Sequence, residues 1–516
     1  MNSLLDTLGL RDRDASVSGA LCVRVERERF AEVATLLAHN HHLPLSLLYA
    51  TDDRKTQGTY GVHAVFEGGQ SGWLMLSTAL PSDDARYASV TRTVLAAHWY
   101  ERYAADMFGI VADGHPDPRR LVLHENMPEG VHPLRKDFAW NTRLPHANVP
   151  YPMHHVDGEG IYEIPVGPIH AGIIEPGHFR FNVAGERIIA LEGKLFFTHK
   201  GCEKLLEGKN AKAALPFIER ISGDASASHA LAFCQAMETL AGCAVPARAN
   251  DIRTLLCELE RITMHVFDIG NIIGNGTGYT VLAAHGFRLR EDMMRLSHSL
   301  CGNRFWRGMI VPGGCARDLD DRALRAVRSC LDAVCFDAAR LFAMAMRSDA
   351  VRERLETTGT LRRDAALAYG AVGTTARASG IDRDVRRDHP YASYPRCPFR
   401  VAVHTSGDVY ARLLVRSEEL AASAAIVRHL LQDFSSGPIL VPCSPTSGTA
   451  IGAVESWRGE LLHVVRMHEG VIDRCAVRDP SFCNWPLFGE IGPGNIVPDF
   501  PLCNKSLNLS YSGTDL

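Results

Sequence analysis

The segment ARANDIRTLLCELERITMHVFDIG, residues 247–270, constrains the fold most strongly, because its apolar residues recur at steps of three and four. The residues in this stripe are Ile252, Leu255, Leu256, Leu259, Ile262 and Val266. Arg253, Glu260 and Arg261 fall on other faces, so the pattern predicts an amphipathic helix about five turns long. Similar periodicity in residues 321–347 and 417–434 predicts a mainly helical body.

The first part of the chain follows another pattern. CVRVERERF (22–30) indicates a strand leading into a helix, YGVHAVFEG (60–68) and SGWLMLSTAL (71–80) indicate paired strands, and residues 88–110 indicate a helix. Residues 138–160 are rich in Pro, His, Asn and Gly and lack periodicity, as in a linker. We therefore expect an α+β fold, with a small α+β domain over 1–137, a linker over 138–160 and a large mainly helical domain over 161–516.

Composition excludes several classes of protein. The net charge of −4 predicts no attraction to nucleic acid. No apolar run reaches the roughly 18 residues of a membrane span, and the start MNSLLDTLGLRDRD does not resemble a signal peptide. We therefore expect a cytoplasmic chain without a transmembrane segment of its own.

The 14 cysteines show no C-x-x-C spacing, which favours free thiols in a reducing compartment over a zinc or iron–sulfur site. No glycine-rich phosphate loop follows a strand, so no NAD site is expected. The glycine-rich segment IIGNGTGY (272–279) follows a helix and is interpreted as a helix-ending turn.

The stretch WYERYAADMFGIVADGHPDPRRL, residues 99–121, resembles the signature of the 30-kDa subunit of respiratory complex I. Tyr103 departs from that signature, which usually has a glutamate there. Asp117, Arg119 and Arg120 are interpreted as an exposed charged turn that docks a partner. The positions that fit are Glu101, Arg102, Asp106, Met107, Phe108, Gly109, Ile110, Gly114, His115, Pro116, Asp117, Arg119 and Arg120.

The second half resembles the 49-kDa subunit of complex I and, equally, the large subunit of group 4 energy-converting membrane-bound nickel–iron hydrogenases of the formate hydrogenlyase type. The resemblance implies a fused 30-kDa/49-kDa (C/D-type) protein. The matching stretches, in order from Glu163 to Pro486, are EIPVGPIHAG, FFTHKGCEKL, VPARANDIRTLLCELERITMH, NRFWRGMIVPGG, SGDVYARLLVRSEE, VESWRGEL and RDPSFCNWP.

The hydrogenase resemblance implies four cysteine ligands, in a C-x-x-C after an arginine and in a D-P-C-x-x-C near the end. In this chain those positions are Ser222, Ala225, Ser481 and Asn484, and Cys483 lies one residue out of register. A low-valent bimetallic centre requires soft thiolates, which a hydroxyl, a methyl group and an amide cannot replace. We therefore expect that the nickel–iron centre is absent and that this chain binds no cofactor.

The complex I resemblance implies a quinone site between a histidine and a tyrosine. The equivalent positions here are Ile174 and Phe197, neither of which can donate a proton to a quinone oxygen. The supporting acidic residue falls at Ser222, with Asp224 nearby. Quinone reduction in the usual geometry is therefore poorly supported.

Ionisable residues remain in the matching loops, and these are the candidate site residues: His170, His199, Arg220, Asp224, His229 and Asp479. They either relay protons, as buried groups with shifted pKa values can, or bond to one another and to backbone and so anchor loops around a vestigial pocket. Both interpretations stay open here. Arg248, Arg253, Glu258 and Arg261 are interpreted as scaffold ion pairs.

The resemblance implies an oxidoreductase subunit that lies on the inner face of the cell membrane through its partners. Electrons would come from an iron–sulfur small subunit, similar to the B-type small subunit of complex I, which carries the cluster. Their transfer would be coupled to ion translocation by antiporter-like membrane-arm subunits. One alternative is a non-catalytic coupling scaffold, and another is a quinone-reducing subunit of an NADH dehydrogenase-like complex. The isolated chain is expected to be inactive.

Overall fold

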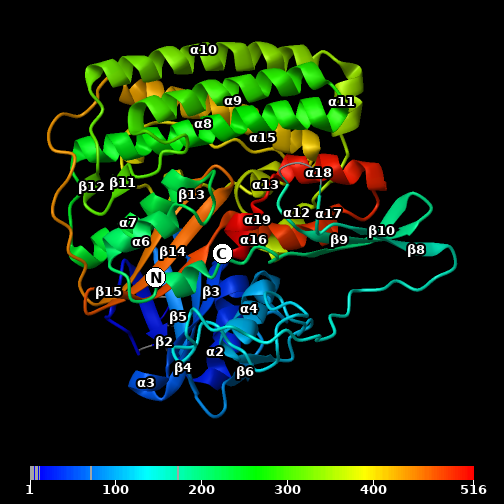
Figure 1. Ribbon diagram of the computed structural model, residues 1–516, viewed down its shortest axis with the longest axis vertical. Helices are drawn as coiled ribbons and strands as arrows, with labels where there is room; N and C mark the ends of the chain where they lie inside the picture. Colours follow the sequence, from blue (N-terminus) through cyan, green and yellow to red (C-terminus); the bar gives the residue numbers. More distant parts are fainter. Residues whose placement is uncertain (1–4, 6–7, 9, 11, 70–71, 171–173) are drawn as a thin grey trace.

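The computed structural model describes residues 5, 8, 10, 12–69, 72–170 and 174–516. Residues 171–172, the end of the EIPVGPIHAG match, lie outside the described residues. Long helices stack at one end of the molecule and the N-terminal sheet lies at the other, with strands β13–β15 between them (Figure 1). The expected α+β fold, a small N-terminal domain followed by a larger one, is confirmed.

The small domain is built on a four-stranded sheet of order β2-β5-β4-β3, in which β2 is parallel to β5 and the other neighbours are antiparallel. Helices α2 (Arg27–Thr35) and α4 (His98–Phe108) pack against this domain's strands. The strands are β2 (Ala20–Arg24), β3 (Leu45–Asp53), β4 (Thr59–Glu67) and β5 (Trp73–Pro81).

The helix predicted over residues 88–110 is shorter than expected, because only α4 is an α-helix. The buried carboxylate of Glu101 on α4 accepts hydrogen bonds from the Ser89 hydroxyl (2.6 Å), the Val90 amide (2.8 Å) and the Thr91 hydroxyl (2.7 Å). These bonds hold residues 89–91 as a loop over the helix. At the other end, Gly109 adopts φ +74° and ends α4.

Residues 114–160, all of which the structure describes, form no helix or strand. Within them, the prediction of an exposed charged turn is wrong. Asp117 is half-buried between Arg102 (3.1 Å) and Arg119 (2.7 Å), and Arg119 continues to Glu192 (2.6 Å) on β10 (Arg187–Lys194). The charges are therefore paired inside the chain, where they tie the small domain to the large one.

The helical body consists of α8 (Ala247–Thr277), α9 (Thr280–Cys301), α10 (Asp321–Met346) and α15 (Val409–Leu430). Helix α8 is the central one and packs against both α9 and α15 (Figure 1). Its polar residues Glu260 and Arg261 are as buried as its apolar stripe, so α8 is not an amphipathic surface helix. It runs through most of IIGNGTGY and ends at Gly278, which adopts φ +83°.

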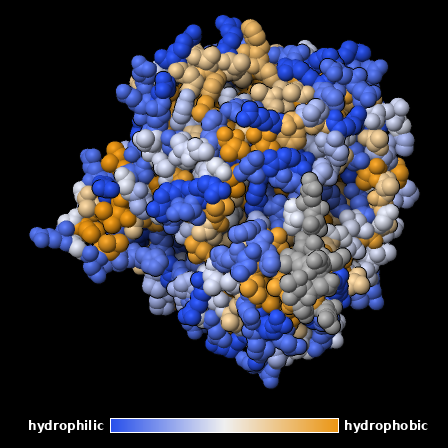
Figure 2. Space-filling model, turned by 180° about the vertical axis from the view of Figure 1, so that it is seen from behind, coloured by the Kyte–Doolittle hydropathy of each residue, from blue (hydrophilic) through white to orange (hydrophobic). Residues whose placement is uncertain are grey.

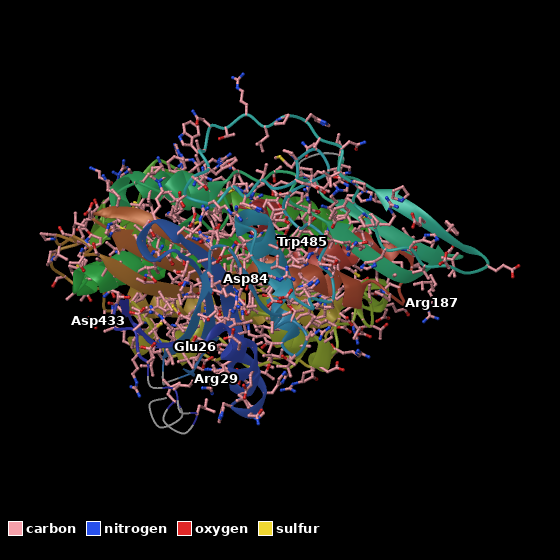
Figure 3. All side chains as sticks on the ribbon, turned by 90° about the horizontal axis from the view of Figure 1, so that it is seen from below. Glu26, Arg29, Asp84, Arg187, Asp433 and Trp485 are labelled. Atoms are coloured by element: carbon pink, nitrogen blue, oxygen red, sulfur yellow. The ribbon has the colours of Figure 1, made fainter. Side chains whose placement is uncertain are left out.

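The large domain also contains two sheets that the sequence did not predict. An antiparallel sheet of β8 (Ile161–Val166), β9 (His178–Ala184) and β10 forms an arm that projects from the body. Seen from below, Arg187 lies on this arm, whereas Trp485 lies within the body (Figure 3). The second sheet joins β13 (Gly448–Ser456), β14 (Gly459–His468) and β15 (Val471–Arg478) to β1 (Val17–Ser18), which pairs parallel to β13.

Shorter elements complete the chain. The strand pairs are β6 with β7 and β11 with β12, and the short helices lie mainly between the long ones. These elements are α3 (Arg54–Gln57), β6 (Arg86–Ala88), β7 (Val111–Asp113), α5 (Cys202–Leu206), α6 (Ala211–Ile218), α7 (Ser226–Ala241), β11 (Ile310–Val311), β12 (Gly314–Cys315), α11 (Asp349–Leu355), α12 (Arg363–Ala368), α13 (Gly373–Ala378), α14 (Val385–Asp388), α16 (Pro480–Asn484), α17 (Phe488–Ile491), α18 (Phe500–Leu507) and α19 (Tyr511–Asp515).

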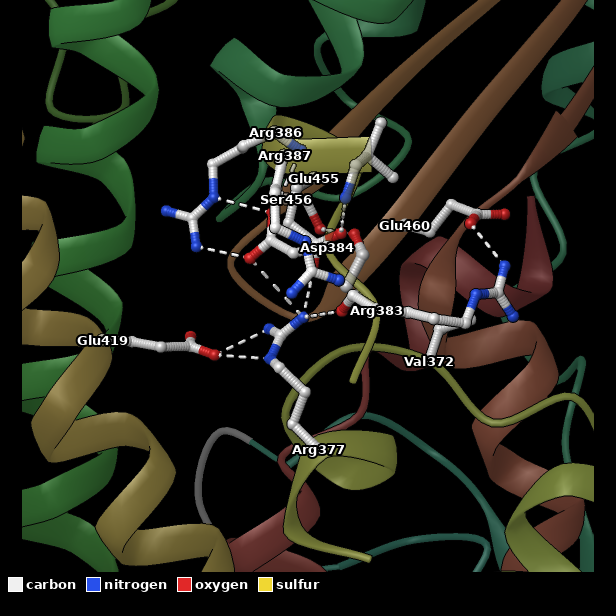
Figure 4. Close-up of polar contacts among 12 residues, drawn as sticks. Val372, Arg377, Arg383, Asp384, Arg386, Arg387, Glu419, Glu455, Ser456 and Glu460 are labelled. Carbon is white, nitrogen blue, oxygen red and sulfur yellow. Dashed lines mark hydrogen bonds and ion pairs between the residues drawn. The ribbon is translucent and has the colours of Figure 1, made fainter. Parts of the chain in front are cut away.

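Buried ion pairs hold these elements together (Figure 4). Arg377 on α13 pairs with Glu419 on α15 (2.7 Å) and Glu455 on β13 (2.7 Å). Arg386 on α14 pairs with Glu258 on α8 (3.1 Å). The predicted scaffold ion pairs are confirmed, since Arg248 pairs with Asp318, Arg253 with Glu238, and Arg261 with Glu258.

The surface of the helical body carries exposed apolar side chains on α9 and α10, namely Val281, Phe287 and Phe336, of which Phe336 is 62% exposed. On the face opposite that of Figure 1, hydrophobic patches alternate with charged side chains (Figure 2). Within the described part of the chain, none of the helices combines the length and the apolar content that a membrane span requires.

Helices α8 and α9 cross closely at Gly270 and Gly286, because a Cβ atom at Gly286 would lie 2.7 Å from the Gly270 Cα atom. We therefore expect Gly286→Ala to lower the free energy of unfolding by about 1–3 kcal/mol, although alanine is the better helix former. Urea denaturation measures this. Ala284→Leu, on an exposed position of the same helix, should change stability by less than about 0.5 kcal/mol. A stabilised Gly286→Ala variant would contradict the close crossing.

Candidate functional site

Two turns from distant parts of the sequence meet in the core, one before α7 and one between β15 and α16. Ser222 and Ser481, in these two turns, are fully buried. Ser510 lies between them: its hydroxyl oxygen is 3.0 Å from the Ser222 hydroxyl oxygen, and its amide donates to the Ser481 hydroxyl oxygen at 2.9 Å. The fold therefore brings the 222 and 481 positions to either side of one residue.

The other two positions of the ligand pattern are also occupied. Ala225 packs against Met264 and Trp457. The Asn484 side chain accepts from the Val372 amide (3.1 Å) and donates to the Val372 carbonyl (3.1 Å), so both ends of the side-chain amide are satisfied by backbone. Neither residue has a free donor atom to offer a ligand in the core.

The donor set at these positions does not fit a nickel–iron centre, since two hydrogen-bonded hydroxyls, a methyl group and a paired amide replace four thiolates. Cys483 does not compensate, because its Sγ atom contacts the Tyr100 hydroxyl (3.1 Å) and accepts from Arg478 Nε (3.0 Å). Among the described residues, His, Cys, Asp and Glu form no group of three or more that could hold a metal ion.

The small domain supports the turn that carries Ser481. Phe482 stacks on Tyr100 at a centroid distance of 4.9 Å and meets the edges of Trp99 (5.5 Å) and Tyr103 (6.2 Å). These three residues belong to the WYERY start of the 30-kDa-like signature. The signature therefore packs onto the RDPSFCNWP stretch, and aromatic contacts position α16.

Asp224, in the first turn, forms two contacts with Arg458, at 2.8 and 2.7 Å, and accepts from the Ser222 hydroxyl at 2.8 Å. Burial acts to raise the pKa of the Asp224 carboxyl, but the Arg458 guanidinium outweighs it and holds that pKa below its ordinary value. Asp224 is therefore ionised near neutral pH, where it orients Ser222.

His229 and Asp479 form a second buried pair, with 3.2 Å between His229 Nε2 and the Asp479 carboxylate. His229 Nδ1 lies 3.0 Å from His463 Nε2 on β14. Burial, with the neighbouring His229, lowers the pKa of His463 well below its ordinary value, and burial of Asp479 is outweighed by its bonds to His229, so its pKa is lowered too. The result is a line of Asp479 carboxylate, His229 and neutral His463 along which a proton can be passed.

The remaining candidates lie apart from these contacts. Arg220 is exposed and donates to the Pro216 carbonyl (2.6 Å), and His170 is half-buried and bonds to the Gly177 carbonyl (2.8 Å). His199 Nδ1 donates to the Asp515 carbonyl (2.5 Å), close to the segment that carries Ser510. The structure therefore brings Asp224, His229 and Asp479 together around the two turns and leaves Arg220 and His170 outside.

At the positions equivalent to the quinone ligands, Ile174 is 52% exposed and the Phe197 ring packs against His124 at 4.5 Å. Residues 171–173, just before Ile174, lie outside the described residues. The described residues thus confront any ligand there with two side chains that carry no transferable proton.

Four residues of the site escaped the sequence reasoning: Ser510, Arg458, His463 and Glu260. Glu260 accepts from the Ala227 amide (2.8 Å) and the Ser228 hydroxyl (2.6 Å) at the start of α7. Burial raises the pKa of its carboxyl to about 7. Its charge on an apolar helix was a signal that could have been used, whereas a lone serine such as Ser510 carried none.

Three family models match the chain. "Respiratory-chain NADH dehydrogenase, 30 Kd subunit" matches residues 23–143, "Nickel-dependent hydrogenase" matches residues 200–269, and "Respiratory-chain NADH dehydrogenase, 49 Kd subunit" matches residues 276–444. The hydrogenase match includes the turn with Ser222 and Ala225. These matches follow one another in the order expected for a fused chain.

Relatives extend over most of the sequence. Hydrogenase-4 component G of Escherichia coli (strain K12) is 32% identical, covering 98% of this chain and 89% of its own length. Formate hydrogenlyase subunit 5 of the same organism is 32% identical over 96% and 89%. The fused C/D subunit of the NADH-quinone oxidoreductase of Rhodopseudomonas palustris (strain BisB18) is 30% identical over 86% and 84%.

A solved structure also matches: a chain of the membrane-bound sulfane sulfur reductase (MBS), an archaeal respiratory membrane complex, with a TM-score of 0.66 and 27% identity. The match covers 71% of this chain and 100% of that chain. The protein therefore belongs to the family of fused 30-kDa/49-kDa subunits of complex I and the related hydrogenases, as the sequence motifs predicted.

Because the pKa of buried His463 lies below the ordinary value of 6.5, the unfolded chain binds this proton first and stability falls as pH drops below 6.5. His463→Gln removes that contribution. Between pH 7 and pH 5.5 the variant should lose about 1.4 kcal/mol less stability than the parent, measured by urea denaturation. The exposed control His429→Gln should lose as much as the parent. Equal losses in His463→Gln and the parent would contradict the buried neutral histidine.

Proposed function

We propose that this chain is the subunit of a membrane-bound, complex I-like oxidoreductase complex that couples electron transfer from an iron–sulfur small subunit to ion translocation, and that its nickel–iron site has lost its ligands. One observation carries the proposal. The family's scaffold is retained around the two turns, while Ser222, Ala225, Ser481 and Asn484 are all engaged in contacts inside the chain.

The names of the relatives support this setting. They are components of a hydrogenase, a formate hydrogenlyase and an NADH-quinone oxidoreductase, and the matching solved chain belongs to a respiratory membrane complex. By this proposal the iron–sulfur cluster lies in the partner small subunit, and this chain binds no cofactor. The chain sits peripherally on the inner face of the cell membrane through antiporter-like membrane-arm subunits. Exposed Val281, Phe287 and Phe336 suit protein contacts of this kind.

For the chain's own chemistry, we propose proton handling by two buried groups. His229 bridges Asp479 and His463, and Glu260, whose pKa burial raises to about 7, is close to half-protonated near neutral pH. Such groups accept and release protons at little cost when charge changes in a neighbouring subunit. Asp224, held ionised by Arg458, fixes the turn rather than relaying protons.

A non-catalytic coupling scaffold is the second candidate, and a specific observation favours it. The side chains at the polar ligand positions are hydrogen-bonded within the chain, which is what a purely structural site requires. Quinone reduction is the weakest of the three, because Ile174 and Phe197 offer no proton.

The absence of a nickel–iron centre is tested by elemental analysis of the complex purified from its native host. We expect nickel well below one atom per chain, alongside iron from the partner's cluster. The Escherichia coli formate hydrogenlyase, purified and analysed in parallel, controls for loss of metal during preparation. One nickel per copy of this chain would overturn the proposal.

The proton-handling role is tested by Glu260→Gln in the assembled complex. If Glu260 exchanges protons during turnover, the variant should pass electrons at least about tenfold more slowly from a dye donor and lose the dependence of rate on pH near 7. Asp318→Asn, which removes an exposed carboxylate paired with Arg248, should leave the rate unchanged. An unaltered rate and pH profile in an intact Glu260→Gln complex would favour the scaffold.

A further inference from the structure

The segment 508–516 is polar in sequence, NLSYSGTDL, yet it lies in the core. Thr514 and Asp515 are fully buried and Leu516 is 3% exposed. Helix α18 ends at Asn508, which adopts φ +45°, and the short helix α19 follows. Buried polar groups persist only where they are hydrogen-bonded, so the partners of this segment indicate what it does there.

Ser510 makes the central contacts. Because the Ser222 hydroxyl donates its only proton to Asp224, the Ser510 hydroxyl donates to Ser222. The same Ser510 oxygen accepts from the Gly513 amide (2.8 Å), and the Ser510 amide donates to Ser481 (2.9 Å). One residue thus cross-links the turn before α7 to the turn before α16.

The residues that follow reach a third loop, 196–202, which lies in the FFTHKGCEKL stretch. The Asp515 carboxylate accepts from the amides of Phe196 (2.8 Å) and Thr198 (2.9 Å), and the Leu516 carbonyl accepts from the amides of Lys200 (3.0 Å) and Cys202 (3.1 Å). The bonds to 196–202 therefore come from both side chain and backbone.

The segment also approaches the two turns too closely for a larger residue. At Gly513, an added Cβ atom would lie 2.5 Å from an Asp479 carboxylate oxygen. The Ser512 hydroxyl donates to the Ile221 carbonyl (2.8 Å), and Lys200 Nζ donates to the Ser512 hydroxyl (2.8 Å). All three loops that carry the site motifs are thus bonded to this one segment.

We infer that segment 508–516 is an internal plug that does the structural work of a metal centre: it cross-links the 196–202, 220–226 and 479–485 loops with hydrogen bonds where thiolate–metal bonds would otherwise join the two turns. The four ligand positions cannot hold the loops by coordination, and Ser510 sits between two of them. The three loops and the plug should accordingly open as one cooperative unit.

This inference rests on the proposed loss of the metal ligands but not on the electron-transfer role. Its test measures amide hydrogen exchange rather than activity or metal content, so failure of one proposal can be told from failure of the other.

The test compares Ser510→Ala with Ser506→Ala in the purified complex. Ser506 is also fully buried and makes two hydrogen bonds, to Arg412 and to the Cys503 carbonyl, but it lies outside the plug contacts. We expect Ser510→Ala to speed exchange by about tenfold or more in all three loops together, because two buried groups lose their partner. Ser506→Ala should leave the three loops unchanged. Faster exchange confined to 508–516, or the same pattern in both variants, would overturn the plug.

If Ser510→Ala does not accumulate, native-state exchange of the parent chain in rising urea, below the unfolding transition, gives the same answer. The plug predicts that amides in 508–516 and in the three loops share one opening free energy and one dependence on urea. Separate openings would rule it out. Ser510→Thr, which keeps the hydroxyl, should exchange like the parent if the overall packing is preserved.

Discussion

Two buried turns that meet in the core need a bond between them, and in this protein that bond is a serine hydroxyl. Ser222 and Ser481 come from segments separated by an entire helical bundle, and both contact Ser510. A hydrogen bond contributes far less than a metal–thiolate bond, so a single serine is insufficient by itself. The Asp224–Arg458, Asn484–Val372 and Asp515–Phe196 contacts share the task.

The surrounding scaffold makes such a substitution possible. Helix α8 places Glu258, Glu260 and Arg261 in the core, where Arg386, the start of α7 and the β13–β14 turn satisfy them. From the other side, the aromatic residues of α4 contact Phe482. The loops are therefore positioned from outside as well as bridged from within, and charges and aromatic contacts keep the family's geometry while the ligands differ.

The sequence predicted the parts of this arrangement that follow from periodicity or from motifs. Helices α8, α10 and α15 were indicated by three- and four-residue steps, and the fused 30-kDa/49-kDa organisation was indicated by stretches of matching residues. Strands β13–β15 were missed because they are buried on both faces, so their sequence lacks the polar–apolar alternation of a half-exposed sheet. The role of Ser510 had no signal, since its partner Ser222 lies 288 residues away.

The turn at Asp117 shows a different limit. Its charges suggested an exposed docking site, but Arg102 and Glu192, from two other segments, pair with them inside the fold. Charge patterns alone do not reveal which charges find partners within the same chain.

The central claim, that protein contacts occupy the place of the metal, is tested most directly by an experimental map of the complex at a resolution that shows side chains, with anomalous scattering recorded at the nickel edge. The account predicts continuous density for 508–516, with the Ser510 hydroxyl within hydrogen-bonding distance of Ser222 and no nickel signal. A bimetallic peak, or a bound quinone head group, between Ser222 and Ser481 would contradict it.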